Sequence, residues 1–501
     1  MIVNTDEREP CTSSKECTTR FGEPSACVNA ECTKLLTPEC TEVLPANAMT
    51  QDNVMLVGFL GALAGDFASY GTPTKEGAEL ALNEIELAGN GLSAPTNSNT
   101  GQRHLAMLVC DHAEDPSRVA RHLVENAKVP VIIGDSFSSA TLKMFDEVAR
   151  PAGVLVLSPS ATSPALTAHG DDGLLWRTSP SDVVQAETLK FLVADVESVL
   201  HQQGVLAEGQ RAKIAMPTKS DSAGLGLAAA AIAPPESDTG APAVDPGLPD
   251  QYPNPDNPET GTVDWQIHID KIVKYAPHII LAMGTGEFVS SMMKGIEDKW
   301  TSPRRPWYLL PEGDRVTELS ALVANNPDYA LNERVLGTAP GARRSTLYGG
   351  FANRFSAAFD NRDPGNLAEF GYDAAYLVAY AIAIANKTAP TGRELANAMR
   401  NVSCDKPEKK VPAGPSGFSR YFTAAENDGC IDFEGASGPL NFDPDTGEAL
   451  SDIGMWCVRR NSSGSYGFEP PLQSFYSVKD RAIDEGTPPL DLSQPGWCED
   501  Q

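Results

Sequence analysis

The stretch 131–167 constrains the fold most, because it contains two short apolar runs, each followed by a polar turn. The first run is Val131-Ile132-Ile133, closed by Gly134, and the second covers 153–157. Apolar runs of this length, bounded by turn residues, are typical of parallel strands that are buried on both faces. The helical segment between them makes a strand–helix–strand unit, so both turns are expected at one sheet edge. In open α/β sheets this edge, at the carboxyl ends of the strands, binds ligands.

Both turns are rich in hydroxyl groups. Ser136, Ser138 and Ser139 follow the first strand, and the second turn reads SPSAT at 158–162. Hydroxyls and main-chain N–H groups at the start of a helix suit a carboxylate or another small anion. One serine turn alone is usually just a helix cap, but two turns at the same edge favour a binding site.

Strands and helices alternate along most of the chain, which predicts parallel, doubly wound sheets. The pattern occurs twice, so we expect an α/β protein with two lobes. Residues 234–262, rich in Pro, Asp and Gly, are predicted to form a solvated surface loop. The predicted strands lie at 54–60, 104–110, 213–216 and 278–283, and the predicted helices at 75–88, 117–126, 224–233, 265–275 and 367–386.

The ten cysteines indicate disulfides. Five fall within the first forty residues, without the paired C-x-x-C spacings or the histidines of a zinc site. An even total with loop-rich flanks is typical of an oxidising compartment, and residues 1–52 are predicted to be a cystine-rich extension. The spacing leaves the connectivity open. The expected pairing is two bridges within 11–32, then Cys40–Cys110, Cys404–Cys430 and Cys457–Cys498.

Length and charge exclude several classes of protein. The 501 residues can bury more than one core, and no apolar run reaches the ~18 residues of a membrane helix. A net charge of −28 argues against nucleic acids and anionic membrane surfaces as partners. The start, MIVNTD, has neither the basic residues nor the apolar core of a signal peptide, so we expect a signal or lipid-anchor segment to have been removed.

Motifs for catalysis or cofactor binding are weak, and we expect no catalytic residues, no cofactor and no metal. No Walker A, H-E-x-x-H or G-x-S-x-G sequence occurs. Gly224-x-Gly226-x-x-Ala229 formally matches a dinucleotide fingerprint, but the acidic residue expected ~20 positions later falls inside 234–262. His112, near Cys110, is predicted to be a surface histidine beside a bridge.

Short motifs follow one another in a fixed order between about residues 53 and 480. The motifs are GDFASYG at 65–71, CDHAEDP at 110–116, GDSFSSAT at 134–141, SPSATSP at 158–164, WRTSPSD at 176–182, PEG at 311–313, GYDA at 371–374 and FEGASG at 433–438. Each motif alone is weak, but the ordered set is specific. Together they resemble the type I periplasmic solute-binding proteins, specifically the branch that binds leucine, isoleucine and valine for ABC transporters.

The resemblance implies two α/β lobes that are joined by three crossovers and close like a hinge. Lobe 1 is then expected at 53–177 and 316–434, and lobe 2 at 178–315 and 435–480, with a C-terminal tail at 481–501.

The resemblance also implies a ligand site for an α-amino acid. Ser138 and Thr162 would bind the carboxylate, while the Ala161 carbonyl and the Thr162 hydroxyl would accept from the ammonium. Glu312 would supply the counter-charge, with a surface or hinge salt bridge as its alternative role. Ser139 would lie beside Ser138, and Tyr70 would cover the site. Where relatives place aromatic residues, this chain has Ala223 and Gly284-Thr285-Gly286, which predicts a larger or more open side-chain pocket.

The implied function is a non-catalytic, monomeric solute-binding protein of the periplasm or cell envelope. It would capture an amino acid or a similar small polar ligand and deliver it to an ABC permease in the membrane. The alternatives are a ligand-sensing ectodomain or regulator on the same fold, and an enzyme that turns over its ligand.

Overall fold

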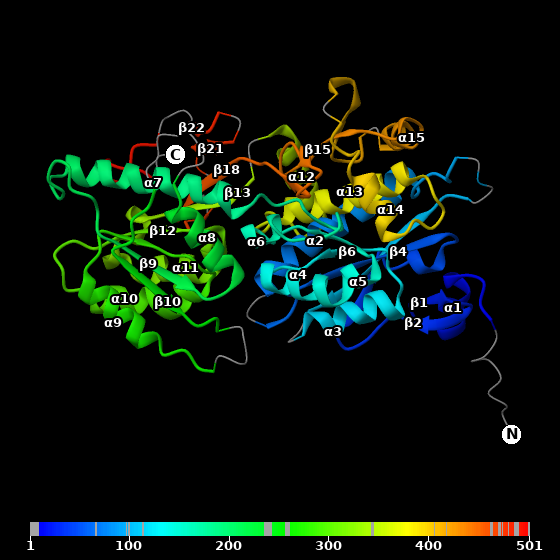
Figure 1. Ribbon diagram of the computed structural model, residues 1–501, viewed down its shortest axis with the longest axis horizontal. Coiled ribbons are helices and arrows are strands. Elements are labelled where there is room, and N and C mark those ends of the chain that lie inside the picture. The colour runs from blue at the N-terminus through cyan, green and yellow to red at the C-terminus, as the bar shows by residue number, and fades with distance from the viewer. Residues whose placement is uncertain are drawn as a thin grey trace. The chain divides into compact units, whose positions relative to one another are not determined.

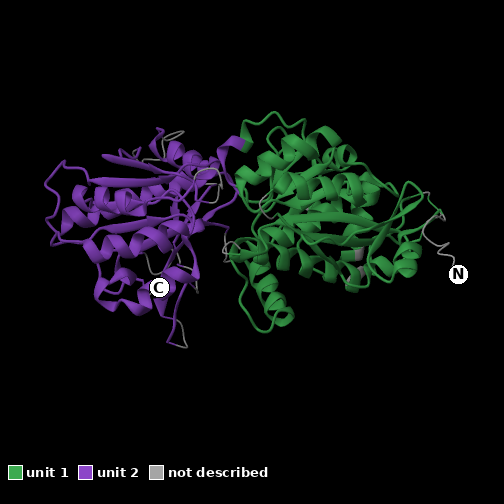
Figure 2. Cartoon of the chain, turned by 90° about the horizontal axis from the view of Figure 1, so that it is seen from below, with its two compact units in different colours: residues 1–161, 166–179, 344–450 green, residues 162–165, 180–343, 451–501 purple. Residues whose placement is uncertain are grey.

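The computed structural model divides into two compact units (Figure 2). Each unit has its own hydrophobic core. The first unit comprises residues 1–161, 166–179 and 344–450, and the second comprises 162–165, 180–343 and 451–501. The structure describes residues 10–65, 68–96, 98, 101–112, 115–234, 243–255, 261–341, 345–404, 406–416, 418–460, 464–468, 472, 474–478, 480–484 and 490–498.

The points at which the chain changes unit differ from those expected at 315/316 and 434/435. The chain stays in the second unit through residue 343, because β13 (Val335–Pro340) is a strand of that unit's sheet. It stays in the first unit through residue 450, because β17 (Glu448–Ala449) pairs with the first sheet.

The first unit is built on an eight-stranded sheet with the order β16-β17-β8-β7-β6-β4-β5-β3. Strands β8, β7, β6, β4 and β5 run parallel. Every residue of β6 and β7 is buried, which confirms the two buried strands predicted around the serine turns. The strands are β3 (Cys40–Leu44), β4 (Val54–Gly61), β5 (His104–Asp111), β6 (Val131–Gly134), β7 (Leu155–Ser158), β8 (Leu175–Arg177), β16 (Phe442–Asp443) and β17.

Two long helices of this unit, α2 (Ala68–Gly89) and α13 (Ala368–Ala385), pack closely side by side (Figure 1). A Cβ atom on Gly77 would lie 1.9 Å from the Ala368 carbonyl oxygen, and one on Gly371 would lie 2.1 Å from that of Thr74. Only glycine allows this approach.

Helix α2 begins seven residues before the predicted 75. The other helices are α3 (Pro116–Arg121), η3 (His122–Asn126), α4 (Ser138–Met144), η4 (Phe145–Ala149), α5 (Arg150–Ala152), α6 (Pro164–Thr167), α12 (Thr346–Ala358), α14 (Gly392–Met399), η10 (Pro407–Lys409) and α15 (Phe418–Asp428), and a small sheet pairs β14 (Lys410–Pro412) with β15 (Asp432–Glu434).

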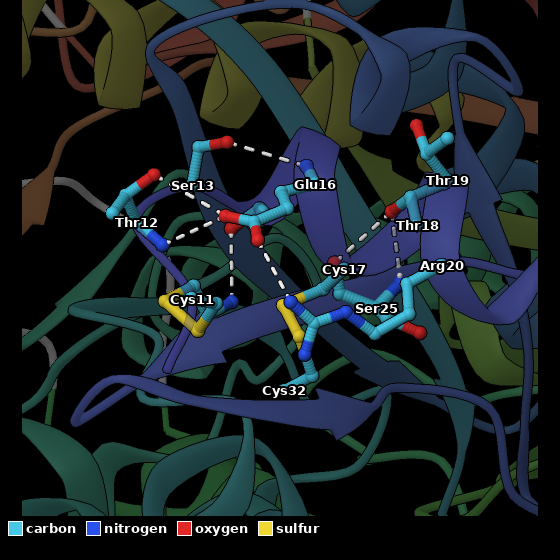
Figure 3. The surroundings of a disulfide bond; sticks show 12 residues. Cys11, Thr12, Ser13, Glu16, Cys17, Thr18, Thr19, Arg20, Ser25 and Cys32 are labelled. Carbon is cyan, nitrogen blue, oxygen red and sulfur yellow. Dashed lines mark hydrogen bonds and ion pairs between the residues drawn. A yellow bond between two sulfur atoms is a disulfide. The ribbon is translucent and has the colours of Figure 1, made fainter. Parts of the chain in front are cut away.

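The cystine-rich extension folds as a helix and a hairpin and then joins the first sheet. Disulfides Cys11–Cys27 and Cys17–Cys32 lie within it, and Glu16 accepts from the Thr12 N–H and pairs with Arg20 beside them (Figure 3). Strand β3 pairs antiparallel with β5, and Cys40–Cys110 bonds the two strands. Residues 40–44 are therefore an edge strand of the first unit. The elements are α1 (Ser14–Phe21), β1 (Ser25–Val28), β2 (Glu31–Lys34) and η1 (Ala48–Thr50).

The second unit contains another eight-stranded sheet, with the order β10-β9-β11-β12-β13-β18-β21-β22. Its edge strand β10 (Leu248–Tyr252) lies inside the segment predicted to be a surface loop and pairs parallel with β9. That prediction is wrong for residues 248–252, because the sheet supplies β10 with hydrogen bonds and burial that local composition does not reveal. The remaining strands are β9 (Ile214–Lys219), β11 (Ile279–Leu281), β12 (Trp307–Leu310), β18 (Ile453–Cys457), β21 (Phe475–Ser477) and β22 (Ala482–Asp484).

Helices follow the strands of this sheet as predicted, and the C-terminal segment is anchored to it. The Trp497 indole N–H donates to the Glu333 carbonyl, and Cys457–Cys498 is a disulfide, as is Cys404–Cys430 in the first unit. All five expected cysteine pairings are confirmed. The elements are α7 (Asp182–Gln202), α8 (Ser222–Ile232), α9 (Trp265–Tyr275), η6 (Val289–Met293), α10 (Lys294–Lys299), η7 (Glu312–Asp314), α11 (Thr317–Asn325), η8 (Pro327–Tyr329), η9 (Leu331–Glu333), β19 (Arg459–Arg460) and β20 (Tyr466–Gly467).

Among the described helices, none is both long enough and apolar enough to cross a lipid bilayer.

Candidate functional site

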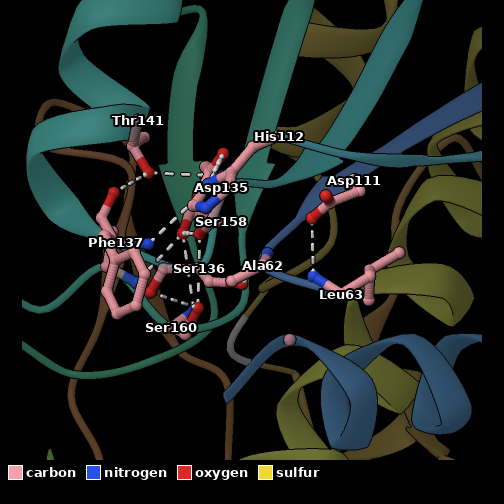
Figure 4. A network of polar contacts seen from close by, with 12 residues as sticks. Ala62, Leu63, Asp111, His112, Asp135, Ser136, Phe137, Thr141, Ser158 and Ser160 are labelled. Carbon is pink, nitrogen blue, oxygen red and sulfur yellow. Dashed lines mark hydrogen bonds and ion pairs between the residues drawn. The ribbon is translucent and has the colours of Figure 1, made fainter. Parts of the chain in front are cut away.

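In the first unit, hydrogen bonds tie together the serine turns that follow β6 and β7 (Figure 4). The Ser158 hydroxyl donates to the Asp135 carbonyl at 3.1 Å, and the Ser160 hydroxyl donates to the same oxygen at 3.2 Å. Ser160 also donates to the Ser136 carbonyl, while the Ser136 hydroxyl accepts from the Ala62 N–H at 3.0 Å. The expectation that the two turns meet at the carboxyl edge of one sheet is therefore confirmed.

A buried aspartate, Asp135, pairs with the half-buried His112 beside these turns, and this pair was not predicted. The two carboxylate oxygens of Asp135 lie 2.9 and 3.0 Å from His112 Nδ1, and the Phe137 N–H donates to one of them. The histidine is less exposed than the prediction of a surface residue implies: its side chain is 14% exposed, and it follows β5, which β4 separates from β6 in the sheet. A carboxylate directly after the strand-ending Gly134 is the sequence signal that could have indicated Asp135.

Aromatic rings flank the first serine turn. The Phe137 ring centroid lies 5.6 Å from that of Tyr70 and 5.8 Å from that of His112. Tyr70 belongs to the first turn of α2 and is partly exposed. The structure therefore brings Tyr70 beside the turn that leads into Ser138.

Ser138 and Ser139, the first two residues of α4, differ in burial. Ser138 is 4% exposed, whereas Ser139 faces solvent. The Thr141 hydroxyl donates to the Phe137 carbonyl at 2.9 Å and holds the start of the helix. Of the two serines, Ser138 is the better placed for a buried polar contact.

Ala161 and Thr162 are both buried, but the main-chain carbonyl of Ala161 is already engaged. It accepts from Arg177 Nη1 at 3.1 Å and from the Ser179 hydroxyl at 3.4 Å. A carbonyl oxygen has two lone pairs, so these two hydrogen bonds leave none of them for the ammonium contact expected at Ala161. The Thr162 carbonyl accepts from the Asp182 N–H at 2.8 Å.

In the second unit, Glu312 lies in the turn η7 that follows β12, again at the carboxyl edge of a parallel sheet. Its carboxylate accepts from Gln185 Nε2 of α7. The same Nε2 donates to the Thr338 hydroxyl at 3.0 Å, so β13 and α7 together position Glu312. Burial raises the pKa of Glu312 above its usual value.

A cluster of charged residues that the sequence did not reveal occupies the same edge. The Lys219 ammonium, at the end of β9, lies 3.4 Å from Asp221 and 4.0 Å from Glu287, and donates to the Thr285 hydroxyl. Asp314, two residues after Glu312, is fully buried. These residues come from three turns, which follow β9, β11 and β12, so no single spacing in the sequence joins them.

Gly284 does not open a side-chain pocket, contrary to the prediction. A Cβ atom there would lie 2.3 Å from the Tyr252 hydroxyl and 2.5 Å from Glu287 Oε1. Tyr252, on β10, donates to Glu287 at 2.7 Å. The space next to Gly284 is thus filled by a polar pair whose aromatic member comes from the segment predicted to be a loop.

Strand β10 also bears on the dinucleotide fingerprint at 224–229, because that fingerprint requires an acidic residue on the strand after the helix. An acidic residue, Asp250, does lie on the strand after α8, so the stated reason for excluding a nucleotide was wrong. Asp250 is nevertheless engaged, because it pairs with His268 and Lys271, each at 2.8 Å.

Comparison with known proteins identifies the family. The family model "Periplasmic binding protein" matches residues 55–450. A Leu/Ile/Val-binding protein from Citrobacter freundii is 31% identical over 160 residues, covering 30% of this chain and 41% of that protein. The chain spans less than half the length of the curated relatives that it matches.

Solved structures share the fold. The branched-chain amino-acid transporter substrate-binding protein of Streptococcus pneumoniae, in complex with isoleucine, superposes with a TM-score of 0.58 at 19% identity and covers 83% of this chain and 98% of that one. A solute-binding protein of an ABC transporter from R. palustris, in complex with benzoate, gives 0.58 at 16% identity, covering 83% and 96%. Because the family model spans most of the chain and these structures share its two α/β units, the chain belongs to the type I periplasmic binding proteins.

Proposed function

We propose that this protein captures an α-amino acid, or a similar small polar solute, outside the cytoplasm and delivers it to an ABC-type importer. The observation that carries the proposal is the placement of Glu312, held by Gln185 at the carboxyl edge of the second sheet. The first unit contributes hydroxyl-rich turns at the corresponding edge of its own sheet.

These groups match the two ends of an α-amino acid. Ser138 and Thr162 would donate to the carboxylate, while Glu312 and the Thr162 hydroxyl would accept from the ammonium. An ammonium removed from water is costly unless a carboxylate pairs with it. Tyr70 would cover the bound solute, Ser139 and Ala161 would line the two turns, and the two units would close on it.

Membership of this family supports an ABC transporter as the partner and a location outside the cytoplasm. Relatives are named Leu/Ile/Val-binding proteins, and solved relatives are named as components of ABC transporters, which favours transport over sensing. Five disulfides among the described residues fit a periplasmic or cell-envelope protein. We further propose that it acts as a monomer on an ABC permease, anchored by lipid or free in the periplasm.

A thermal-shift screen against amino acids, amides, polyols and small carboxylates tests the ligand class. Solute at a hundredfold above Kd should stabilise the protein by about 2.7 kcal/mol. Isothermal titration should then show that Glu312→Gln weakens an α-amino ligand by about 2–5 kcal/mol. Glu318→Gln, at an exposed position of α11, is the matched control and should leave the affinity unchanged. Equal affinities for the two variants would contradict the role of Glu312.

The proposal also requires that the solute be released chemically unchanged. Mass spectrometry of ligand recovered after prolonged incubation should show one species. Conversion of the ligand would identify an enzyme on this fold instead.

A further inference from the structure

Asp314 is a buried carboxyl group that lacks a hydrogen-bond donor. It is 0% exposed, and neither of its side-chain oxygens has a hydrogen-bond partner within the described structure. Main-chain hydrogen bonds fix the position of Asp314. The Asp314 N–H donates to the Pro311 carbonyl, and the Asp314 carbonyl accepts from the Val316 N–H. Because a buried carboxyl without a donor is destabilising, this arrangement calls for an explanation.

The side chains around Asp314 are mostly acidic. Glu312 is in the same turn, and the Glu287 carboxylate also acts electrostatically on Asp314. Lys219 also acts electrostatically on Asp314, and its ammonium lies 3.4 Å from Asp221 and 4.0 Å from Glu287, so these carboxylates share its charge. The neighbouring Arg315 guanidinium lies over the Phe468 ring, 5.5 Å from its centroid. Three carboxyl groups, those of Asp221, Glu287 and Asp314, therefore share the charge of one lysine.

A second unsatisfied acceptor lies next to Glu312. The Gln185 side chain is 1% exposed, and its amide oxygen has no donor in the described part of the chain, although its Nε2 is fully used. The Asp314 carboxyl oxygens and the Gln185 amide oxygen are thus buried acceptors without a donor among the described residues. They would be satisfied by a ligand that brings several N–H donors.

Burial, together with the Glu287 and Glu312 carboxylates, raises the pKa of Asp314 well above its usual range. A raised pKa favours the uncharged form of Asp314, and an uncharged carboxyl group costs less to bury than a carboxylate. Tyr252, whose hydroxyl donates to Glu287, is the other titratable group beside this cluster, and its pKa is also raised by burial.

We propose that Asp314 is the counter-charge for a second cationic group on the solute, so that the ligand is an amino acid with a positively charged side chain. This rests on the proposed function, in which Glu312 holds the α-ammonium. Asp314 would give up its proton when the side-chain cation arrives, forming a carboxylate–cation pair in place of a neutral acid. The net charge of the buried cluster then changes little.

Matched pairs of ligands test this inference by isothermal titration at pH 7. L-Lysine against L-norleucine, and L-arginine against L-citrulline, differ chiefly in the side-chain charge. The intact protein should bind each cationic member roughly tenfold or more tightly than its neutral partner. Titration in two buffers of different ionisation enthalpy should show release of up to one proton with the cationic ligands only.

Substitutions at Asp314 and Glu312 distinguish the roles of these two carboxylates. Asp314→Asn should abolish both the charge preference and the proton release while leaving the affinity for the neutral ligands within about threefold. Glu312→Gln should weaken both members of each pair, and Glu318→Gln should change neither. The buffer comparison on the unmodified protein needs no variant, so it remains valid if Asp314→Asn folds poorly.

Two negative results are distinguishable. If neutral amino acids bind as tightly as cationic ones and Asp314→Asn has no effect on the preference, the role of Asp314 is overturned and the proposed function stands. If no amino acid binds to the intact protein, both proposals are overturned together.

Discussion

The Ser158 hydroxyl donates a hydrogen bond to the main-chain carbonyl of Asp135 across 3.1 Å, and it accepts from the Ala161 N–H at 3.0 Å. One buried side chain therefore joins the turn after β6 to the turn after β7. The geometry of the first unit's candidate site depends on this link, because both turns carry predicted ligand contacts.

Replacing Ser158 with alanine should lower the free energy of unfolding by about 1–3 kcal/mol, because it leaves the buried Ala161 N–H without its acceptor. Urea denaturation measures this change. Ser198→Ala, at an exposed position of α7, is the matched control and should have no measurable effect. Equal midpoints for the two variants would show that the link between the turns contributes nothing to stability.

Asp373 should make stability fall as pH rises through the weakly acidic range. It is buried and accepts from the Ala436 and Ser437 N–H groups at 2.8 Å, yet burial raises its pKa from 3.8 to about 7. The folded state therefore keeps a proton that the unfolded chain has lost between pH 4 and 7, so unfolding becomes easier by up to roughly 4 kcal/mol over that interval.

Comparison of the unfolding free energy of the intact protein with that of Asp373→Asn isolates this contribution, because asparagine does not titrate. The difference between the two curves should change between pH 4 and 7 and level off above it. Asp363→Asn, at an exposed position, should reproduce the pH dependence of the intact protein. Parallel curves for Asp373→Asn would contradict the raised pKa.

Arg103 should be among the most sensitive positions of the first unit. Its guanidinium is fully buried, pairs with Glu426 at 3.0 Å and donates to the Ser93 and Lys387 carbonyls. Arg103→Met should cost about 3–5 kcal/mol of unfolding free energy, because it leaves a carboxylate buried without its partner. Arg103→Met combined with Glu426→Gln should recover part of the loss.

Chemical denaturation of both variants measures this coupling. Arg150→Gln removes an exposed pair with Asp172 and should leave stability unchanged. If the double variant were no more stable than Arg103→Met, the carbonyl contacts rather than the ion pair would be responsible for the cost.

The disulfide Cys40–Cys110 should hold the extension on the first sheet. It closes a loop with a sequence separation of 70 residues, and its removal by paired alanine substitutions should lower the unfolding free energy by about 2–4 kcal/mol. Limited proteolysis should then cut earlier within 40–52. Removing Cys11–Cys27, which lies inside the extension, should leave strand β3 protected. Unchanged cleavage after removal of Cys40–Cys110 would show that β3 pairing alone is sufficient.

The sequence by itself determined the parallel α/β character, the buried strands at β6 and β7 and the presence of disulfides, whereas the pairing of Cys11 with Cys27 and of Cys17 with Cys32 came from the structure. A short apolar run such as Val131–Gly134 buries both of its faces as a central strand of a parallel sheet that helices cover on both sides. Local turn residues mark where the strand ends. The serines at 136 and 158 could be placed at one sheet edge for the same reason, because successive parallel strands end on the same side.

Only the tertiary structure decided what surrounds those edges. Strand β10 exists because β9 offers it hydrogen bonds, although its own sequence, LPDQY, has little strand character. The Asp135–His112 pair and the gathering of Lys219, Glu287 and Asp314 join residues from different loops. Burial and electrostatic pairing depend on three-dimensional neighbours rather than on spacing along the chain, so the charge of the candidate site became visible only when the chain was folded.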